Sequence, residues 1–497
     1  MPLEQTFAHS WSRAVLMWPD RPFLVWESSA GQVMQWSYVA FDRLVDRVAG
    51  TLHAAGVGPQ AGVHLALTNS PAFVAIWLAA VRLGSFVIPC DPHSAAPEIA
   101  HQLHRTRPAV GVASLRRLDD YRSAASPLEV ELFSVDEDDV ALEMFDGSAP
   151  AALEDPAPLD TAAIMFTSGT TSTPKGVVIT QANYAFAGEI MAAAADLGSD
   201  DRQLVVLPLF HANAQYYSFA SAIAVGASVA LMSGFSASRF IAQAARHAAT
   251  HASLFAAPMR MILARGAFGR DDLRLRHVWY AQNVTGEQYQ SLSALLRCRP
   301  RQLYGMTETI PAVLTASVQD ADGDGSMGRP TPGCAVTLRD VDGDGVGELL
   351  VGGRPGLELF REYLDDPATT SQSFTEDGWF RTGDLARSEG GRYYFAGRRN
   401  DVLKVAGENV SLPEVEAVLA EYPSVFEAAV VGRPDPIRDE VPVAYVVTQE
   451  GVARPTADAL AQWCAARLSP LKRPRDYIFV DELPRTSVGK IRKFLLR

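Results

Sequence analysis

Short apolar runs alternate with longer amphipathic stretches through the first half of the 497-residue chain. The runs GVHLALT (62–68) and SFVIPC (85–90) flank the helix-like segment AFVAIWLAAVRLG (72–84). The same rhythm resumes after residue 160 with AAIMFTS, GVVIT and an Ala-rich helical stretch near 181–197. This alternation is typical of βαβ units around a mostly parallel sheet. We therefore expect an α/β fold with two α/β lobes.

The second half of the chain changes character. Between about 326 and 396, short β-like pieces are separated by Gly, Pro and Asp, which predicts a β-rich subdomain of hairpins. Within it, DVDGDG (340–345) lacks the twelfth-position glutamate of a calcium loop and is better explained as an acidic turn. We expect a large N-terminal domain at 1–396, a hinge at 397–401 and a small mobile α+β domain at 402–497.

Composition excludes several classes of protein. A net charge of -13 argues against a nucleic-acid binder, which usually has a basic surface stripe. The most apolar window is broken by Arg82 and Gly84, which argues against a membrane span. The N-terminus has no secretory pattern, so a cytoplasmic protein is expected. Four widely spaced cysteines suggest buried thiols and neither a zinc site nor disulfides: Cys90, Cys298, Cys334 and Cys464.

The stretch TSGTTSTPKG (167–176) lies between two apolar runs. Its glycines allow close backbone approach, its hydroxyls and amides can donate to phosphate oxygens, and Lys175 adds positive charge. The order GxxxxGK[ST] of a Walker A loop is absent. A flexible polar surface loop has the same composition, so this stretch alone leaves both interpretations open.

Further motifs occur in order along the chain: YGMTE (304–308), RTGD (381–384), GRRND (397–401) and PRTSVGKIRK (484–493). Together with TSGTTSTPKG they resemble the signatures of the adenylate-forming superfamily, which includes acyl-CoA synthetases, nonribosomal-peptide adenylation domains and luciferases. The resemblance covers essentially the whole length. Its C-terminal third looks most like the crotonobetaine/carnitine-CoA ligase branch.

The resemblance implies that the chain binds ATP with Mg²⁺. Tyr304 would stack on adenine, Thr307 would hydrogen-bond the α-phosphate, and Glu308 would hold Mg²⁺ through a hard carboxylate oxygen. Thr170 would be the second metal ligand, and Asp384 would accept hydrogen bonds from the ribose hydroxyls. The residues expected to bind the nucleotide are Thr167, Ser168, Gly169, Thr170, Thr171, Lys175, Asn283, Tyr304, Asp384 and Arg398.

The same resemblance assigns the C-terminal residues. Lys490 would stabilise charge at the α-phosphorus as pyrophosphate leaves. The alternative is that Lys490 belongs to a solvated basic tail without a catalytic role. The hinge would fall at Asn400, where many relatives carry a charged residue, and Gly407 would let a thiol cofactor pass the backbone. Ser172 replaces a common glycine, so the loop geometry can differ from that of relatives.

The resemblance implies an acid pocket along LPLFHANAQYYSF (207–219) and WYAQNVTGE (279–287). His211 would gate the acid or the thiol, although a lone histidine after an apolar run is often structural. The predicted lining is unusually polar: Asn213, Gln215, Tyr216 and Gln282. A long fatty acid would leave such groups unpaired at about 1–3 kcal/mol each. A small or polar acid is therefore favoured.

The expected reaction joins an acid to AMP, releases pyrophosphate and transfers the acyl group to a thiol, most simply CoA. A stand-alone carrier protein, an amine acceptor and adenylation of an inorganic oxyacid such as nitrite stay open, as does a catalytically inactive nucleotide-binding protein. No nucleic-acid or membrane partner is expected. Homo-oligomerisation is left open.

Overall fold

The computed structural model describes residues 5–496, except 127, 129, 149–153, 168–173, 267–268, 321–322, 399–401, 406–407, 436–438 and 486–490. The chain forms two compact units. The large unit comprises Met1–Asp324, Gly328–Ala335 and Gly352–Trp379. The small unit comprises Gly325–Met327, Val336–Val351 and Phe380–Arg497. Each unit is described by itself.

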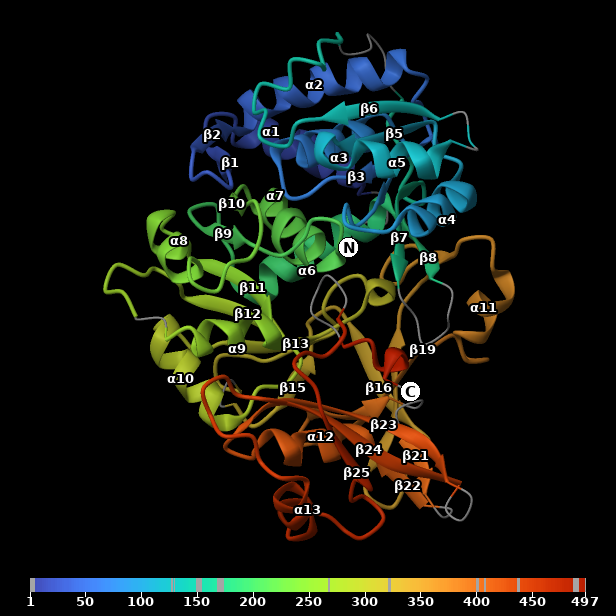
Figure 1. The fold of residues 1–497 in the computed structure, drawn as a ribbon. Coiled ribbons are helices and arrows are strands. Elements are labelled where there is room, and N and C mark those ends of the chain that lie inside the picture. Colours follow the sequence, from blue (N-terminus) through green and yellow to red (C-terminus); the bar gives the residue numbers. More distant parts are fainter. Residues whose placement is uncertain are drawn as a thin grey trace. The chain divides into compact units, whose positions relative to one another are not determined.

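One sheet of the large unit has seven strands and confirms the expected βαβ pattern (Figure 1). The neighbours from β7 to β6 pair in parallel, and β8 and β18 add an antiparallel edge. In sheet order the strands are β18 (Glu362–Tyr363), β8 (Lys175–Thr180), β7 (Thr161–Thr167), β4 (Phe86–Pro89), β3 (Gly62–Ala66), β5 (Val110–Ser114) and β6 (Glu131–Val135).

The second sheet of the large unit has a parallel centre from β13 to β1. In order its strands are β14 (Leu314–Thr315), β13 (Arg301–Tyr304), β12 (His277–Ala281), β11 (His251–Phe255), β9 (Arg202–Val205), β10 (Ser228–Met232), β1 (Pro22–Glu27) and β2 (Val33–Ser37). Strand β15 (Ser326–Pro330) pairs with β14 through Arg329 and Pro330. The expectation of two α/β lobes is therefore confirmed.

Helices connect these strands. They are α1 (Phe7–Met17), α2 (Tyr38–Ala54), α3 (Pro71–Arg82), α4 (Ala96–Thr106), η1 (Leu115–Arg117), α5 (Leu118–Ala125), α6 (Gln181–Ala195), η2 (Asn213–Ala220), α7 (Ser221–Val225), α8 (Phe240–Arg246), α9 (Ala256–Ala264), α10 (Gly286–Leu296), η3 (Thr307–Thr309) and α11 (Pro367–Gln372). Helix α6 contacts β7 and β8 on one side and the π-helix η2 on another, while η2 contacts β9 and β11. This helical layer links the two sheets and carries part of the expected acid pocket.

Helix α3 is the apolar window of the sequence. Pro71 opens it, the Ser70 side chain accepts from the Phe73 amide as an N-cap, and eleven of its twelve residues are buried. A helix that is apolar all round belongs in a core. Arg82 ends it with ion pairs to Asp42 and Asp46 of α2. Among the described helices, none has the length and apolar character needed to cross a bilayer.

The small unit begins with the predicted hairpins β16 (Ala335–Arg339), β17 (Val346–Gly352), β19 (Phe380–Glu389) and β20 (Arg392–Arg398). The DVDGDG stretch is an acidic turn, as expected, because the Asp342 carboxylate accepts from the amides of Asp344 and Val346 at 3.0 and 2.9 Å. The five-stranded sheet and its helices follow: β21 (Val402–Val405), β22 (Glu408–Ser411), α12 (Leu412–Ala420), β23 (Val425–Asp435), β24 (Asp439–Thr448), α13 (Ala457–Ala465), β25 (Asp476–Phe479) and η5 (Lys493–Leu495).

The division into units differs from the expected domain ranges. Residues 336–351 and 380–398 cluster with the C-terminal residues, because their strands pair with one another and α12 packs on β20. The hinge predicted at 397–401 includes residues outside the described part, so the hinge and the ranges 1–396 and 402–497 stay predictions.

Candidate active site

The ends of the phosphate-type loop lie side by side in the large unit. Strand β7 ends at Thr167 and β8 begins at Lys175, and these two residues are register partners. The loop leaves the carboxyl end of β7, the edge at which α/β sheets place their ligands. Residues 168–173 are outside the described part of the chain, so the roles of Ser168, Gly169, Thr170 and Thr171 stay predictions.

The YGMTE motif leaves the carboxyl end of β13, which is parallel to β12. Tyr304 is the last residue of the strand, and Thr307 and Glu308 form the single 3₁₀ turn η3. The turn is closed by the Met306 amide, which donates to the Thr309 hydroxyl at 3.0 Å. Tyr304 and Thr307 are partly exposed while Glu308 is buried, so the two ligand-facing candidates remain accessible and the carboxylate is sheltered.

The turn ends in an unusual backbone conformation. Ile310 follows η3 with φ 68° and is fully buried. A β-branched residue at positive φ is strained, and such strain persists only where the surroundings fix the chain. The chain that directly follows YGMTE is therefore held by the packed core around Ile310.

Glu308 and Lys175 contact the same tyrosine side chain. The Tyr363 hydroxyl donates to Glu308 Oε1 at 3.1 Å, and Lys175 Nζ lies 4.9 Å from the centre of the Tyr363 ring. Burial raises the pKa of the Tyr363 phenol, and the Glu308 charge raises it further, so the hydroxyl stays a donor. Sequence reasoning missed Tyr363, since it stands 55 positions from Glu308 and outside every motif considered.

The expected acid-pocket residues begin at the π-helix η2. His211 is partly exposed just before it. Gln215 is fully buried and satisfied within the protein, because its amide donates to Leu209 O at 2.6 Å and its oxygen accepts from the Tyr184 hydroxyl. Tyr216 is also fully buried, with its hydroxyl 3.5 Å from Met165 Sδ. Neither residue therefore supports a polar pocket.

Asn213 is different. It is the first residue of η2, it is buried, and its Oδ1 atom has no hydrogen-bond partner among the residues that the structure describes. A buried acceptor without a donor costs about 1–3 kcal/mol unless something else fills the role. π-Helical turns are frequent at functional sites. Among the predicted lining residues, Asn213 thus has a buried side-chain oxygen that could accept a hydrogen bond from a ligand.

The second predicted pocket segment lies after β12. Gln282 is exposed and has φ 72°, the left-handed region that non-glycine residues rarely adopt. Asn283, expected at the nucleotide, is exposed, and its Oδ1 accepts from Gln302 Nε2 of β13 at 2.6 Å. The bond ties this loop to the strand that ends in Tyr304.

Two predicted nucleotide ligands belong to the small unit. Asp384 of β19 and Arg398 of β20 are register partners, and Arg398 Nε lies 3.2 Å from Asp384 Oδ1. Asp384 is buried and Arg398 is exposed. The carboxylate expected to accept from ribose is therefore already engaged by the neighbouring predicted ligand. Asn400, Gly407 and Lys490 lie outside the described residues.

Residues 11–364 match the family model described as AMP-binding enzyme, and residues 414–490 match its C-terminal domain. The chain belongs to the AMP-binding enzyme family. It is similar to crotonobetaine/carnitine–CoA ligases of Escherichia coli O7:K1 (31% identity) and Proteus mirabilis (32%), with 98% of both chains covered in each comparison. Its fold matches o-succinylbenzoate CoA synthetase of Bacillus subtilis with the acyl-adenylate intermediate (26% identity, TM-score 0.87, 99% and 98% of the chains).

The membership makes this protein an AMP-forming ligase of the adenylate-forming superfamily, as the motifs suggested. The described residues contain no cluster of three or more His, Cys, Asp or Glu side chains that could hold a metal. Mg²⁺ typically takes one or two carboxylates and fills its other positions with phosphate oxygens and water. The buried carboxylate of Glu308 fits that mode of binding.

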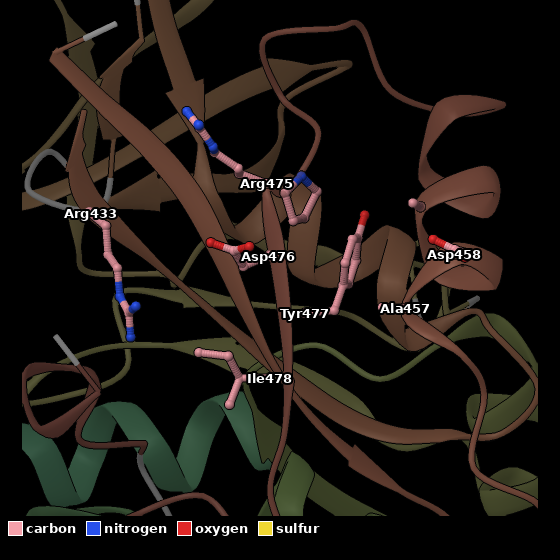
Figure 2. Close-up of a pocket in the computed structure, with 9 residues that line it drawn as sticks. Arg433, Ala457, Asp458, Arg475, Asp476, Tyr477 and Ile478 are labelled. Carbon is pink, nitrogen blue, oxygen red and sulfur yellow. The ribbon is translucent and has the colours of Figure 1, made fainter. Parts of the chain in front are cut away.

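A hollow of about 390 Å³ lies within the small unit of this AMP-binding enzyme (Figure 2). On β25, Asp476 and Ile478 point to one side and Tyr477 points to the other, toward α13, as strand alternation requires. Arg433 and Arg475 also line it. Its lining contains none of the residues predicted for nucleotide or acid, so we assign it no part of the active site.

A test of the site's packing uses Gly305, inside YGMTE. A Cβ there would lie 2.8 Å from the Tyr217 hydroxyl and 3.0 Å from Ala312 Cα. Gly305→Ala should lower the free energy of unfolding by about 1–3 kcal/mol through overpacking. Gly286→Ala is the control, because a Cβ at Gly286 meets nothing within 4 Å. Urea titration measures both; equal stability of the two variants would contradict the close packing.

Proposed function

We propose that this enzyme activates a small, polar carboxylic acid with ATP, releases pyrophosphate and passes the acyl group from AMP to the thiol of CoA. The observation that carries the proposal is the full-length likeness to relatives named crotonobetaine/carnitine–CoA ligases. The similarity to a CoA synthetase solved with an acyl adenylate supports the same intermediate. The identity of the acid and the use of CoA belong to the proposal.

In the first half-reaction a carboxylate oxygen of the acid attacks the α-phosphorus, and the bond from that phosphorus to pyrophosphate breaks. Lys490, Thr307 and the loop that ends in Lys175 would hold the charge at the phosphates, since phosphoryl transfer depends on positioning and electrostatic stabilisation. A bound Mg²⁺ would add charge neutralisation at the phosphates, with Glu308 and Thr170 as ligands. Tyr304 would position the adenine.

In the second half-reaction the thiolate of CoA attacks the acyl carbonyl carbon, a thioester forms and AMP leaves with the electrons of the broken carbon–oxygen bond. AMP is a far better leaving group than the hydroxide of the free acid, which is the reason for the first step. We assign Gly407 to the passage of the thiol and Asn400 to the hinge on the strength of the motifs that contain them.

Asn213 supports a polar acid. Its buried Oδ1 would accept a hydrogen bond from an N–H or O–H group of the substrate, which recovers the cost of the unpaired acceptor. A long alkyl chain would leave that cost in place. Gln215 gives no such support, because its side-chain amide is hydrogen-bonded within the protein.

The test is acid-dependent release of pyrophosphate with ATP and a graded panel of acids. 3-Hydroxybutyrate should exceed butyrate, and both should exceed octanoate. Asn213→Leu, of similar shape, should abolish the preference for the hydroxyl. No release with any acid would favour a nucleotide-binding protein without catalysis, and a preference for octanoate would contradict the polar pocket.

The acceptor is tested with the best acid of that panel. CoA, a phosphopantetheine carrier protein and simple amines are added separately, and the products are identified by mass. We expect acyl-CoA. A product formed only on the carrier or the amine would contradict the assignment of CoA.

A further inference from the structure

We propose that Tyr363 is a positioning residue that orients the Glu308 carboxylate for the metal–nucleotide complex and holds Lys175 beside it. The inference rests on the proposed function, because it assumes that Glu308 faces Mg²⁺ of bound ATP. It assigns a role to a residue that belongs to none of the motifs of the resemblance.

The backbone around Tyr363 is fixed to the strand that follows the phosphate-type loop. Strand β18 pairs with β8 through Tyr363 and Val177, and the Leu364 amide donates to Gly176 O at 2.8 Å. A Cβ on Gly176 would lie 3.1 Å from Leu364 Cβ, so glycine permits this close approach. The Tyr363 amide donates to Thr370 Oγ1 of α11 at 2.9 Å. The main chain at Tyr363 is thereby held on two sides.

The same segment is fixed to Glu308. The Phe360 amide donates to Glu308 O at 2.9 Å, and the Tyr363 hydroxyl donates to Glu308 Oε1 at 3.1 Å. The two aromatic rings pack with centres 4.8 Å apart. Glu308 therefore has its main chain and its side chain held by one short stretch, at residues 360–363.

These contacts have a chemical consequence. A hydrogen bond to one oxygen of a ligating carboxylate fixes the orientation of the group, and loss of such a partner typically weakens metal binding about 10–100-fold. The ring also attracts the Lys175 ammonium group, a cation–π contact. Tyr363 thus positions both the Glu308 carboxylate, which is expected at the metal, and the Lys175 ammonium group, which is expected at the phosphates.

The decisive variant is Tyr363→Phe, which keeps the ring beside Lys175 and removes only the hydroxyl. Tyr289→Phe is the matched control: Tyr289 is buried, and its hydroxyl donates to Pro300 O at 3.2 Å, in the core of the same unit. Mn²⁺ binding to each enzyme with a non-hydrolysable ATP analogue is measured from the free Mn²⁺ signal in electron paramagnetic resonance. This readout needs no turnover.

We expect Tyr363→Phe to weaken Mn²⁺ binding by at least about tenfold, in the range for lost partners of ligating carboxylates, and Tyr289→Phe to leave it unchanged. In a Glu308→Gln background, Tyr363→Phe should add little, because the pair acts as a unit. Unchanged Mn²⁺ binding in Tyr363→Phe, equal weakening in both variants, or full additivity with Glu308→Gln would overturn the inference. Absence of acid-dependent pyrophosphate release would instead overturn the proposed function. The Mn²⁺ comparison would still test the inference about Tyr363.

Discussion

Lys490→Ala should lower the rate of acyl-adenylate formation by about 10²–10³-fold, the usual cost of removing one preorganised charge that faces a developing oxyanion. Thioester formation from supplied acyl adenylate should change far less, because that step no longer breaks a bond at the α-phosphorus. The two half-reactions are measured separately, by pyrophosphate release and by acyl-CoA formation from synthetic acyl adenylate. Equal loss in both would remove Lys490 from the proposed role.

The described neighbours of Lys490 argue against a merely solvated basic tail. Arg485 forms an ion pair with Glu427 of β23, and Lys493 Nζ lies 2.8 Å from Glu416 Oε1 of α12. Arg485 and Ile491 are bridge partners, so the chain is held on both sides of residues 486–490.

Lys493→Ala is the matched control for Lys490→Ala. It removes a lysine three positions away and breaks the pair with Glu416, which is partly exposed and therefore worth about 1 kcal/mol or less. It should leave both half-reactions within a few-fold of the unaltered enzyme. A large loss of adenylation in this variant would show that the tail acts through its general charge.

The parts of the fold that were predictable are those that depend on local sequence. The alternation of apolar runs and amphipathic segments around 62–90 was sufficient to predict β3, α3 and β4. Each of these elements has a hydrophobic pattern of its own in the local sequence. The acidic turn at Asp342 followed in the same way from turn chemistry. TSGTTSTPKG was expected between two apolar runs, and those runs form β7 and β8, which flank it.

The parts that were not predictable depend on partners distant in the sequence. Gln215 was assigned to a polar pocket, yet its partners are Tyr184 on α6 and a backbone carbonyl, which composition cannot reveal. Its orientation also depends on a π-helical period that no 3.6-residue pattern anticipates. The hydrogen bond from Tyr363 to Glu308 was not predicted for the same reason, since it depends on the pairing of β18 with β8.

Acidification should destabilise this enzyme between about pH 6.5, the ordinary pKa of histidine, and pH 4. The cause is His64 of β3, which is fully buried and whose pKa burial lowers to about 4. Its Nδ1 lies 2.9 Å from the Tyr121 hydroxyl and its Nε2 lies 3.2 Å from Gln102 Oε1. The neutral ring that accepts at Nδ1 and donates at Nε2 satisfies both neighbours, whereas the charged ring loses the acceptor that Tyr121 needs.

The sign follows from proton binding. Between pH 6.5 and 4 the unfolded chain takes up a proton at this position and the folded protein does not, so stability is complete above pH 6.5 and falls as the pH drops toward 4. A difference of about 2.5 pKa units corresponds to roughly 3 kcal/mol. His251 and His277, whose pKa values burial also lowers, act in the same direction. The total decrease in the free energy of unfolding on acidification should therefore exceed the decrease that His64 alone causes.

The measurement is the free energy of unfolding from urea titrations at steps from pH 7.5 to 4. His64→Gln should be less stable than the unaltered enzyme at pH 7.5 but should lose about 3 kcal/mol less on acidification, since it has no proton to take up there. His9→Gln, at an exposed position of α1, controls for the loss of a histidine. Parallel pH profiles for the unaltered enzyme and His64→Gln would show that His64 accepts its proton in the folded state at an ordinary pH. The neutral arrangement between β3, α4 and α5 would then be wrong, because a charged ring donates at Nδ1 and cannot accept the hydroxyl proton of Tyr121.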